Sequence, residues 1–443
     1  FYTLALFFKI FGPTVMTERL YALAVNTMLA ASFFMVLRQC RIDLISALNA
    51  WLIALLLICV INLPSYPVFP SILLINISIT LLIRYTETPN PSLLLISGGM
   101  LAFAALFRHE LAAFSCLSIL TYLFTRFQHD KVKNIKLFLL GVTSTGLPFL
   151  LYFIHKSGFD SLIFQLIIAP SEIMPKFRSL PYPTGLSLKS LPFYLIPTLL
   201  LISFIYAFKQ MVLNKKTSPS LTAAFIYSLI GLIFMLQATV RSDLTHLLPP
   251  ALMLAGAFPA FTHNAFKQIK HPILKKYNLI ICIALSAVTV SYSASKMYTI
   301  SHRVNETHEL TKLGHFPVSE DVLKTIHYIQ KNTTQSDAIF VGVQNHDRFT
   351  INDTALYFLS DRQYGTKYHE FAPGIISSHK IQTEIINELK TNNVKLIVLA
   401  PRHWYEPNLS NTDWQTDTLD NYIKDNYELS TAFGIYTIYT KKA

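Results

Sequence analysis

The chain has 443 residues, of which 52% are hydrophobic and 14% are charged, and its mean hydropathy is +0.40. A soluble domain carries roughly 25% charged residues, so this composition excludes a soluble globular protein and indicates an integral membrane protein. The net charge of +12 would suggest a nucleic-acid partner in a soluble protein, but here most Lys and Arg residues lie in loops beside anionic lipid headgroups. We therefore expect the lipid bilayer, and no nucleic acid, as a partner.

The apolar residues fall in ten runs, and each run is a candidate transmembrane helix. A helix needs roughly 20 apolar residues to cross a bilayer; several runs are shorter, so we expect some tilted or partial spans. In chain order the runs are residues 19–37, 44–62, 68–83, 92–107, 110–125, 137–154, 191–208, 221–238, 247–261 and 278–295. The sequence thus predicts a multi-span membrane domain over residues 1–298.

Lysine and arginine are unevenly distributed between the two sets of loops that alternate along these spans. One set holds the largest groups, between residues 126 and 136 and between residues 267 and 276, whereas the other set holds fewer over more sequence. Short cytoplasmic loops accumulate Lys and Arg, so we assign the first set to the cytoplasm. By alternation, the 156–190 loop, the turns at residues 108 and 241 and the C-terminal region face the other side.

After Ser295 the composition becomes mixed, and the apolar residues recur in short elements. The expected helices are 320–331, 353–359, 379–389 and 419–427, and the expected strands are 338–343, 395–400 and 433–440. Helices that alternate with strands predict a small layered α/β domain, which we place at residues 299–443. No glycine-rich loop follows either buried strand, so we expect no nucleotide site. The fold class is therefore a polytopic α-helical membrane protein with a C-terminal extracytoplasmic α/β domain.

Cysteine offers neither a disulfide framework nor a thiolate metal site. All four cysteines lie in or beside the predicted spans, and the C-terminal domain has none.

Three groups of polar residues lie at the predicted outer ends of spans, where ionisable side chains are costly and indicate function, and a fourth group lies in the long outer loop. The groups are Glu18 and Arg19; Arg108, His109 and Glu110; Arg178 and Tyr182; and Arg241, Asp243 and His246. Arginine presents a planar fork of donors that fits phosphate, and it keeps its charge at any ordinary pH. The four groups predict one surface cavity that binds a lipid-linked phosphate or pyrophosphate.

Each group also has a structural interpretation. Arg19, Arg178 and Tyr182 are residue types that anchor spans at the membrane interface. Glu110 opens a helix, where negative charge is favoured, so it could form a salt-bridged cap with Arg108. For the Arg241 group we favour function, because Arg, Asp and His within six residues exceed what helix capping needs. His246 alone, by contrast, is more often a hydrogen-bonded interfacial residue.

These groups, in their order along the chain, resemble the membrane-embedded GT-C glycosyltransferases, specifically the bacterial branch similar to protein O-mannosyltransferases and aminoarabinose transferases. Residues 1–12 with Glu18, Arg19 and Leu20 are similar to that family's amphipathic segment and the start of its second span. Residues 104–110 resemble its "alanine, leucine, arginine, x, glutamate" turn, and residues 241–250 resemble its late-span motif ending in prolines. In the tail, the residues similar to uncharacterised members are Asn352, Asp353, Tyr357 to Leu359, Arg362, Pro373 and Gly374.

The resemblance implies a polyprenyl-phosphate sugar donor, a glycan, lipid or protein acceptor, and transfer outside the cytoplasm by a multi-pass protein of a bacterial inner membrane. It also implies an aspartate in the first outer loop as the catalytic base, which takes a proton from the acceptor while cationic groups stabilise the departing lipid phosphate. That loop and the first span would precede Phe1, so we expect the chain to begin inside a longer gene product. The base is therefore left unassigned, and the sugar, the acceptor and a divalent metal requirement stay open.

Two other functions compete with the enzyme. A transporter or flippase of lipid-linked saccharide would usually show internal repeats and helices broken near the bilayer midplane, whereas the polar residues here cluster at one surface and no repeat is visible. A catalytically inactive scaffold, whose outer domain binds a partner, is the third interpretation. We favour the glycosyltransferase.

Overall fold

The computed structural model describes residues 2–126, 130–266, 272–301, 310–314, 316–346, 352–369, 376–401, 406–409, 412 and 415–442. The chain forms two compact units. The first unit comprises residues 1–166 and 181–299, and the second comprises residues 167–180 and 300–443. The chain therefore leaves the first unit once, returns to it, and enters the second unit again after residue 299.

Helices make up the first unit, and every one of the ten predicted apolar runs is helical, which confirms the sequence prediction at this level. The main helices are α1 (Tyr2–Phe11), α2 (Val15–Gln39), α3 (Leu44–Ile61), α4 (Val68–Glu87), α5 (Pro91–Ala105), α6 (His109–Arg126), α7 (Lys131–Ser157), α10 (Leu191–Phe208) with η2 (Lys209–Leu213), α11 (Pro219–Val240), α12 (Leu244–Ala265) and α13 (Pro272–Ser301). Among the described residues, seven helices are long and apolar enough to cross a membrane: α2, α3, α4, α7, α10 with η2, α11 and α12. Between α7 and α10, the chain forms α8 (Phe159–Ile163), η1 (Phe164–Ile173) and α9 (Met174–Arg178).

Side-chain caps fix where several of these helices begin. The Thr14 hydroxyl accepts a hydrogen bond from the Thr17 backbone N–H at the start of α2, and the Ser218 hydroxyl does the same for Leu221 at the start of α11. Asp43 caps α3 in the same way. Such caps satisfy backbone donors that have no partner inside the helix, so the short polar turns define the helix ends.

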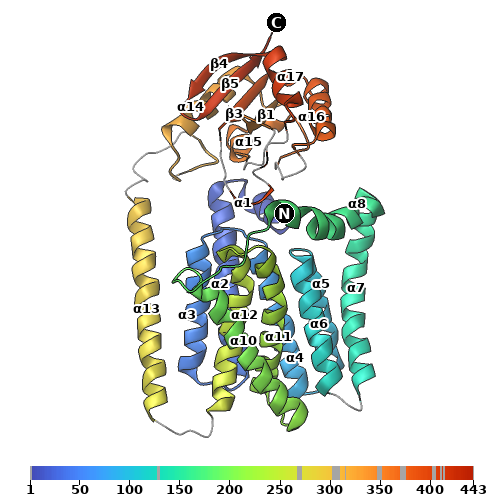
Figure 1. Ribbon diagram of the computed structural model, residues 1–443, viewed down its shortest axis with the longest axis vertical. Helices are drawn as coiled ribbons and strands as arrows, with labels where there is room; N and C mark the ends of the chain where they lie inside the picture. Colours follow the sequence, from blue (N-terminus) through green and yellow to red (C-terminus); the bar gives the residue numbers. More distant parts are fainter. Residues whose placement is uncertain are drawn as a thin grey trace. The chain divides into compact units, whose positions relative to one another are not determined.

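Short turns make consecutive helices antiparallel, so alternate turns meet at the same end of the bundle (Figure 1). The turns at residues 12–14, 62–67, 106–108 and 241–243 lie at one end, which we call the site end. The turns at residues 40–43, 88–90 and 214–218 lie at the opposite end. The predicted cytoplasmic loops that the structure describes are at this opposite end, whereas residues 267–271 lie outside the described residues.

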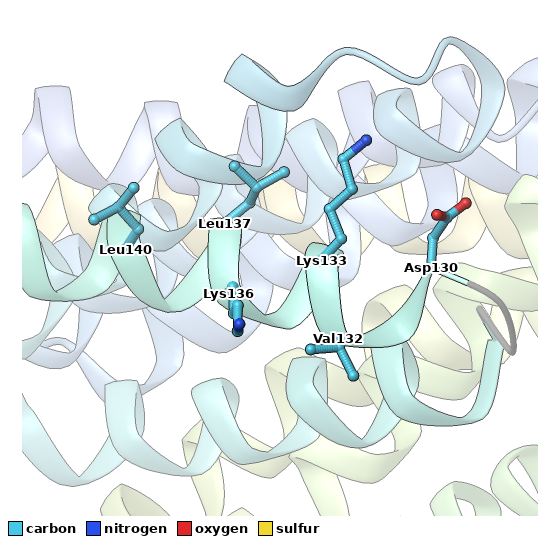
Figure 2. A pocket seen from close by; sticks show the side chains of 6 residues that line it. All are labelled: Asp130, Val132, Lys133, Lys136, Leu137 and Leu140. Atoms are coloured by element: carbon cyan, nitrogen blue, oxygen red, sulfur yellow. The ribbon is translucent and has the colours of Figure 1, made fainter.

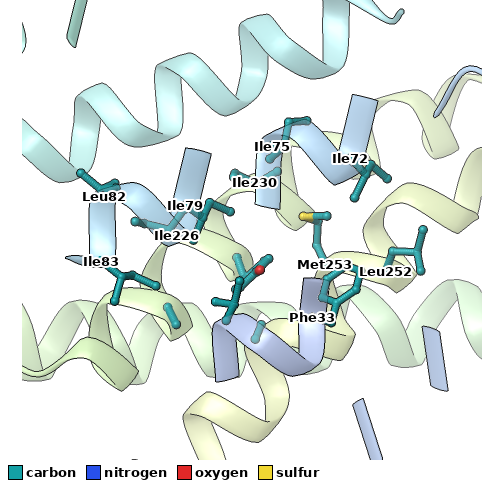
Figure 3. Packing of buried hydrophobic residues seen from close by; sticks show 14 of the residues in the cluster. Phe33, Ile72, Ile75, Ile79, Leu82, Ile83, Ile226, Ile230, Leu252 and Met253 are labelled. Carbon is teal, nitrogen blue, oxygen red and sulfur yellow. The ribbon is translucent and has the colours of Figure 1, made fainter. Parts of the chain in front are cut away.

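Helices α2 to α7 and α10 to α12 all contribute buried residues to the main core. Apolar side chains of α2, α4, α11 and α12 pack against one another (Figure 3), and Phe33, Ile79, Ile230 and Met253 are fully or almost fully buried. Between membrane helices, close packing and interhelical hydrogen bonds replace the hydrophobic effect as the source of association. This core holds the helices whose ends carry the candidate residues.

A buried polar network crosses the same core. The Asn76 side-chain amide donates to the Ser32 hydroxyl at 2.7 Å and accepts from the Tyr227 hydroxyl at 3.0 Å. The three residues come from α4, α2 and α11, and all are buried. Since no water competes for these groups, the network fixes the register of the three helices against one another.

Two glycines bring α5 and α7 into close contact. A Cβ atom on Gly98 would collide with the backbone of Phe138, and a Cβ atom on Gly141 would collide with the backbone of Leu95. Small residues at helix interfaces allow such backbone approach in membranes. This contact ties α5, which precedes the Arg108 turn, to its neighbour.

The second unit is an α/β domain built on a five-stranded sheet with strand order β2-β1-β3-β5-β4. Its strands are β1 (Ala338–Val343), β2 (Gln363–Tyr364), β3 (Leu396–Ala400), β4 (Tyr427–Phe433) and β5 (Tyr436–Lys441), and its helices after residue 300 are α14 (Glu320–Asn332), α15 (Ala355–Ser360), α16 (His379–Thr391) and α17 (Thr418–Asn426). Strand β1 runs parallel to β2 and β3, whereas β5 runs antiparallel to β3 and β4. All residues of β3 are buried, which explains its continuous apolar sequence.

The end of this domain differs from the sequence prediction. A single strand over residues 433–440 is predicted, whereas the structure has the hairpin β4–β5 with a turn at Gly434, whose φ of +54° suits glycine. Strand β4 is an edge strand with mostly exposed side chains, so it lacks the alternation by which strands are predicted. The two-residue strand β2 is too short to give a signal.

The tail residues that carry the family resemblance hold this sheet together. The Asn352 amide donates to the Val341 carbonyl oxygen at 2.9 Å, and the Tyr357 hydroxyl accepts from the Val341 N–H at 2.7 Å. Asp353 accepts from the Tyr436 hydroxyl at 2.7 Å. Arg362 donates to backbone oxygens at the ends of α14 and α15. These four residues therefore have structural roles, and Pro373 and Gly374 lie outside the described residues.

Candidate functional site

The start of α2 places Glu18 and Arg19 at the site end. Both lie in the first turn of the helix, after the Thr14 cap. The Arg19 guanidinium is 3.4 Å from the Glu18 carboxylate, which also accepts a hydrogen bond from the Ser65 hydroxyl of the α3–α4 loop. The Arg19 side chain is 44% exposed and the Glu18 side chain 20% exposed, so the carboxylate anchors a pair whose cation stays accessible.

The turn between α5 and α6 carries Arg108, His109 and Glu110. Arg108 donates to the Glu110 carboxylate, and both side chains are about one-quarter exposed. The His109 ring contacts the Leu166 carbonyl oxygen through Nε2 at 3.0 Å. The predicted salt-bridged pair is therefore present, and it holds the Arg108 guanidinium at the start of α6.

The turn between α11 and α12 is built around Asp243. Its carboxylate accepts from the Arg241 Nε atom at 2.7 Å, from the His246 backbone N–H at 2.9 Å and contacts the His246 Nδ1 atom at 2.8 Å. Asp243 thus caps α12 and orients the side chains of Arg241 and His246. The Arg241 side chain is only 12% exposed, so this guanidinium is well ordered by its surroundings.

Electrostatics keep the Asp243 carboxylate ionised. Burial raises its pKa, but the hydrogen bonds and charge of His246, together with the charge of Arg241, outweigh burial and lower the pKa to about 2. A general base works best with a pKa near the working pH. Asp243 is therefore suited to orienting Arg241 and His246, and poorly suited to accepting a proton.

This pKa gives a testable pH dependence. Because the folded-state pKa lies below the ordinary value of 3.8, the ionised carboxylate stabilises the fold above pH 3.8, and the stabilisation is lost as the pH falls towards 2. We expect Asp243→Asn to lower the free energy of unfolding at pH 7 by roughly 2 kcal/mol, and the difference from the parent to shrink below pH 3.8. Thermal unfolding of the parent and the variant in detergent, at pH values from 7 down to below 3.8, measures this difference in stability.

Asp43→Asn is the matched control, because Asp43 caps α3 at the opposite end and asparagine caps helices as well as aspartate does. An equal loss of stability in Asp43→Asn, or a loss in Asp243→Asn that does not change with pH, would contradict this role of Asp243.

Tyr66 joins the last two turns, and sequence reasoning missed it. Burial raises the pKa of the Tyr66 phenol, Arg108 lowers it by hydrogen bonding and by its charge, and the charges of Asp243 and Glu110 raise it. The net change is upward, so the phenol stays protonated at neutral pH. Tyr66 therefore lies within electrostatic reach of Arg108 and of the carboxylate that holds Arg241.

The α3–α4 loop thus lies beside two of the predicted groups. Ser65 donates to Glu18, and Tyr66 lies within electrostatic reach of Arg108. Neither residue is charged, and the apolar loop sequence around them gives little functional signal. The prolines at positions 64 and 67, which indicate a fixed loop conformation, are the signal that could have drawn attention to it.

Tyr182 and Arg178 belong to different units. Tyr182 donates a hydrogen bond to the Phe193 carbonyl oxygen and packs against a small apolar cluster that includes Ala238 and Leu247, the residues flanking the Arg241 turn. Arg178 ends α9 in the second unit, where the neighbouring Ser179 carbonyl oxygen accepts from the Asn408 amide at 3.1 Å. The convergence of Arg178 with the other arginines stays a prediction.

A separate pocket of about 520 Å³ lies at the opposite end, along the first turns of α7 (Figure 2). It is lined by Asp130, Val132, Lys133, Lys136, Leu137 and Leu140. The 18 residues of α6 span about 27 Å, which separates this pocket from the Arg108 turn. Lys133 and Lys136 point in different directions (Figure 2), so the two ammonium groups do not face a common point.

The described residues hold no group of three or more His, Cys, Asp or Glu side chains that could bind a metal ion. His109 and His246 instead contact a backbone oxygen and a carboxylate, respectively.

No protein-family model and no curated protein sequence matches this chain. Among solved structures, the chain is similar to ArnT from Cupriavidus metallidurans bound to undecaprenyl phosphate, with a TM-score of 0.54 and 10% identity over 100% of this chain and 87% of that one. It is also matched to the arabinofuranosyltransferase AftD from Mycobacteria, with a TM-score of 0.45 and 13% identity over 97% of this chain and 34% of that one. The first likeness shows a shared fold, and the second is too low to carry an argument.

Proposed function

We propose that this chain, which has the GT-C fold of membrane-embedded glycosyltransferases, transfers a sugar from a polyprenyl-phosphate-linked donor to an acceptor. One observation carries the proposal: Arg19, Arg108 and Arg241 come from separate turns, lie at the same end of the helical bundle, and are each paired with a carboxylate. The undecaprenyl phosphate bound to ArnT supports the same class of donor here.

The chemistry of such a transfer matches these residues. The donor carries a lipid phosphate that leaves with growing negative charge, and fixed cations near that position stabilise the transition state. Arginine binds phosphate with two parallel hydrogen bonds, and a neighbouring carboxylate fixes the direction of the fork. We therefore assign Arg108 and Arg241 to the departing phosphate, Glu110 and Asp243 to orienting them, and Arg19 and His246 to the edge of the site.

The proposed function also predicts which end of the helical bundle faces the cytoplasm. Because the described lysine- and arginine-rich loops share the opposite end of the bundle, that end should face the cytoplasm, and the site end and the C-terminal domain should face away from it. A reporter that is active only outside the cytoplasm should work when fused after Ala443. The same fusion with a reporter active only in the cytoplasm should be silent, and a signal from it would contradict this orientation.

Purified full chain in proteoliposomes, supplied with a panel of polyprenyl-phosphate-linked sugars, tests the function. A glycosyltransferase releases free polyprenyl phosphate and passes the sugar to water or an added acceptor. A flippase moves the intact donor to the other leaflet without cleaving it. Movement without cleavage, or neither reaction with any donor, would overturn the proposed activity.

A further inference from the structure

The α3–α4 loop has a constrained backbone. Asn62 ends α3 in the left-handed conformation, with φ of +50°, as asparagine often does at helix ends. Ser65 is also left-handed, with φ of +53°, which serine rarely adopts. Pro64 and Pro67 restrict the chain between and after them. Strained backbone of this kind persists where the surroundings determine it, and it is concentrated at functional sites.

The side chains of this loop point to the charged turns on both sides. Ser65 donates to Glu18, which in turn holds Arg19. The Tyr66 phenol lies near Arg108, whose positive charge lowers the pKa of the phenol. The Tyr66 ring also packs edge-on against Phe69 of α4, with ring centroids 5.5 Å apart, so its hydroxyl has little freedom to move.

We infer that Ser65 and Tyr66 are positioning residues, and that the loop of residues 62–67 orients the Glu18–Arg19 and Arg108–Glu110 pairs for a lipid phosphate. This inference rests on the proposed function, because it concerns the same donor. Tyr66 acts through Arg108: the Glu110 carboxylate holds one side of the guanidinium, and the nearby Tyr66 hydroxyl restricts it further to one orientation. Ser65 acts through Glu18 in the same way, and the left-handed backbone at Ser65 aims its hydroxyl at that carboxylate.

Binding of undecaprenyl phosphate to the full chain, measured by native mass spectrometry, tests the role of Tyr66 without requiring transfer. Tyr66→Phe removes only the hydroxyl and should weaken binding about tenfold, as expected for a hydrogen bond to a charged group. Arg108→Lys should weaken binding by a similar factor. The double variant, with both substitutions, should bind undecaprenyl phosphate almost as well as Arg108→Lys alone. The two effects should not multiply, because both substitutions disrupt the same interaction.

Tyr85→Phe is the matched control. The Tyr85 hydroxyl donates to Asn134 at 2.8 Å near the opposite end of the bundle, so this variant loses a buried hydrogen bond with no expected effect on binding. Multiplicative effects of Tyr66→Phe and Arg108→Lys, or equal losses of binding in Tyr66→Phe and Tyr85→Phe, would refute the positioning role of Tyr66.

Ser65→Gly supplies a second test that does not depend on Tyr66 variants folding. Glycine adopts the left-handed conformation without strain, so the variant should unfold at the same temperature as the parent or a higher one. Its binding of undecaprenyl phosphate should nevertheless fall several-fold, because Glu18 loses its partner. Unchanged binding would overturn the role of Ser65. Lost binding together with a lowered unfolding temperature would mean that the loop is only structural.

If binding behaves as expected but no donor is ever cleaved, the proposed transferase activity fails while the positioning inference stands.

Discussion

Replacement of Arg241 by lysine should lower sugar transfer about ten- to a hundredfold, although the charge is kept. Lysine cannot reproduce the planar fork of donors, so it cannot bind Asp243 through Nε as arginine does at 2.7 Å while also facing a phosphate. The loss of a hydrogen bond to a charged group costs on the order of 1.5 to 3 kcal/mol, which corresponds to this change in rate. Transfer at limiting donor, by variant and parent at matched amounts, measures it.

Arg84→Lys is the control for this substitution, because Arg84 is an exposed arginine in the last turn of α4, at the opposite end of the bundle. It should transfer sugar at the parent rate. An interfacial anchor at position 241 would tolerate lysine equally well, since both side chains reach the headgroups. Unchanged turnover by Arg241→Lys would therefore remove Arg241 from the site.

Alanine at Gly141 should strongly destabilise the membrane domain. The new methyl group would meet the Leu95 backbone, which cannot rotate away as a side chain could, so α5 and α7 must separate. Overpacking typically costs 1 to 3 kcal/mol, occasionally more, and the separation would also shift the Arg108 turn that follows α5. We expect a lower unfolding temperature and weaker undecaprenyl phosphate binding in the same variant.

Gly146→Ala is the matched control on the same helix, because its Cβ atom would meet only the Ala102 Cβ atom at 3.5 Å, an ordinary contact. This variant should unfold at about the parent temperature. Equal unfolding temperatures for the Gly141 and Gly146 variants would mean that the two helices can adjust, and that the close approach of their backbones is not required.

Local sequence signals predict most of the helices. The runs at residues 44–62 and 191–208, for example, agree with α3 and α10 almost to the residue; Asp43 caps the start of the first, and Pro192 lies in the first turn of the second. Strand β3 is predicted because it is a short, continuous apolar run, and the sheet buries all of its residues. Strand β4 is not predicted, since its pairing with β5 depends on contacts made across the Gly434 turn rather than on its own pattern.

The sequence predicts the charged residues of the candidate site but not the uncharged residues beside them. Arg19, Arg108 and Arg241 are identified by their position at the ends of apolar runs, because an ionisable side chain there is costly and therefore indicates a functional role. Ser65 and Tyr66 carry no charge, and their importance comes from which turns meet at one end of the bundle. That arrangement depends on how the helices pack, which the local sequence pattern does not describe.

Photocrosslinking tests the central claim most directly. A polyprenyl phosphate with a diazirine beside the phosphate is irradiated with the full chain, and the labelled peptides are identified by mass spectrometry. We expect label in the loop of residues 62–67 and in the turns around Arg108 and Arg241, and we expect excess unlabelled undecaprenyl phosphate to prevent it. Label confined to the first turns of α7, around Lys133 and Lys136, would contradict a phosphate site at the site end.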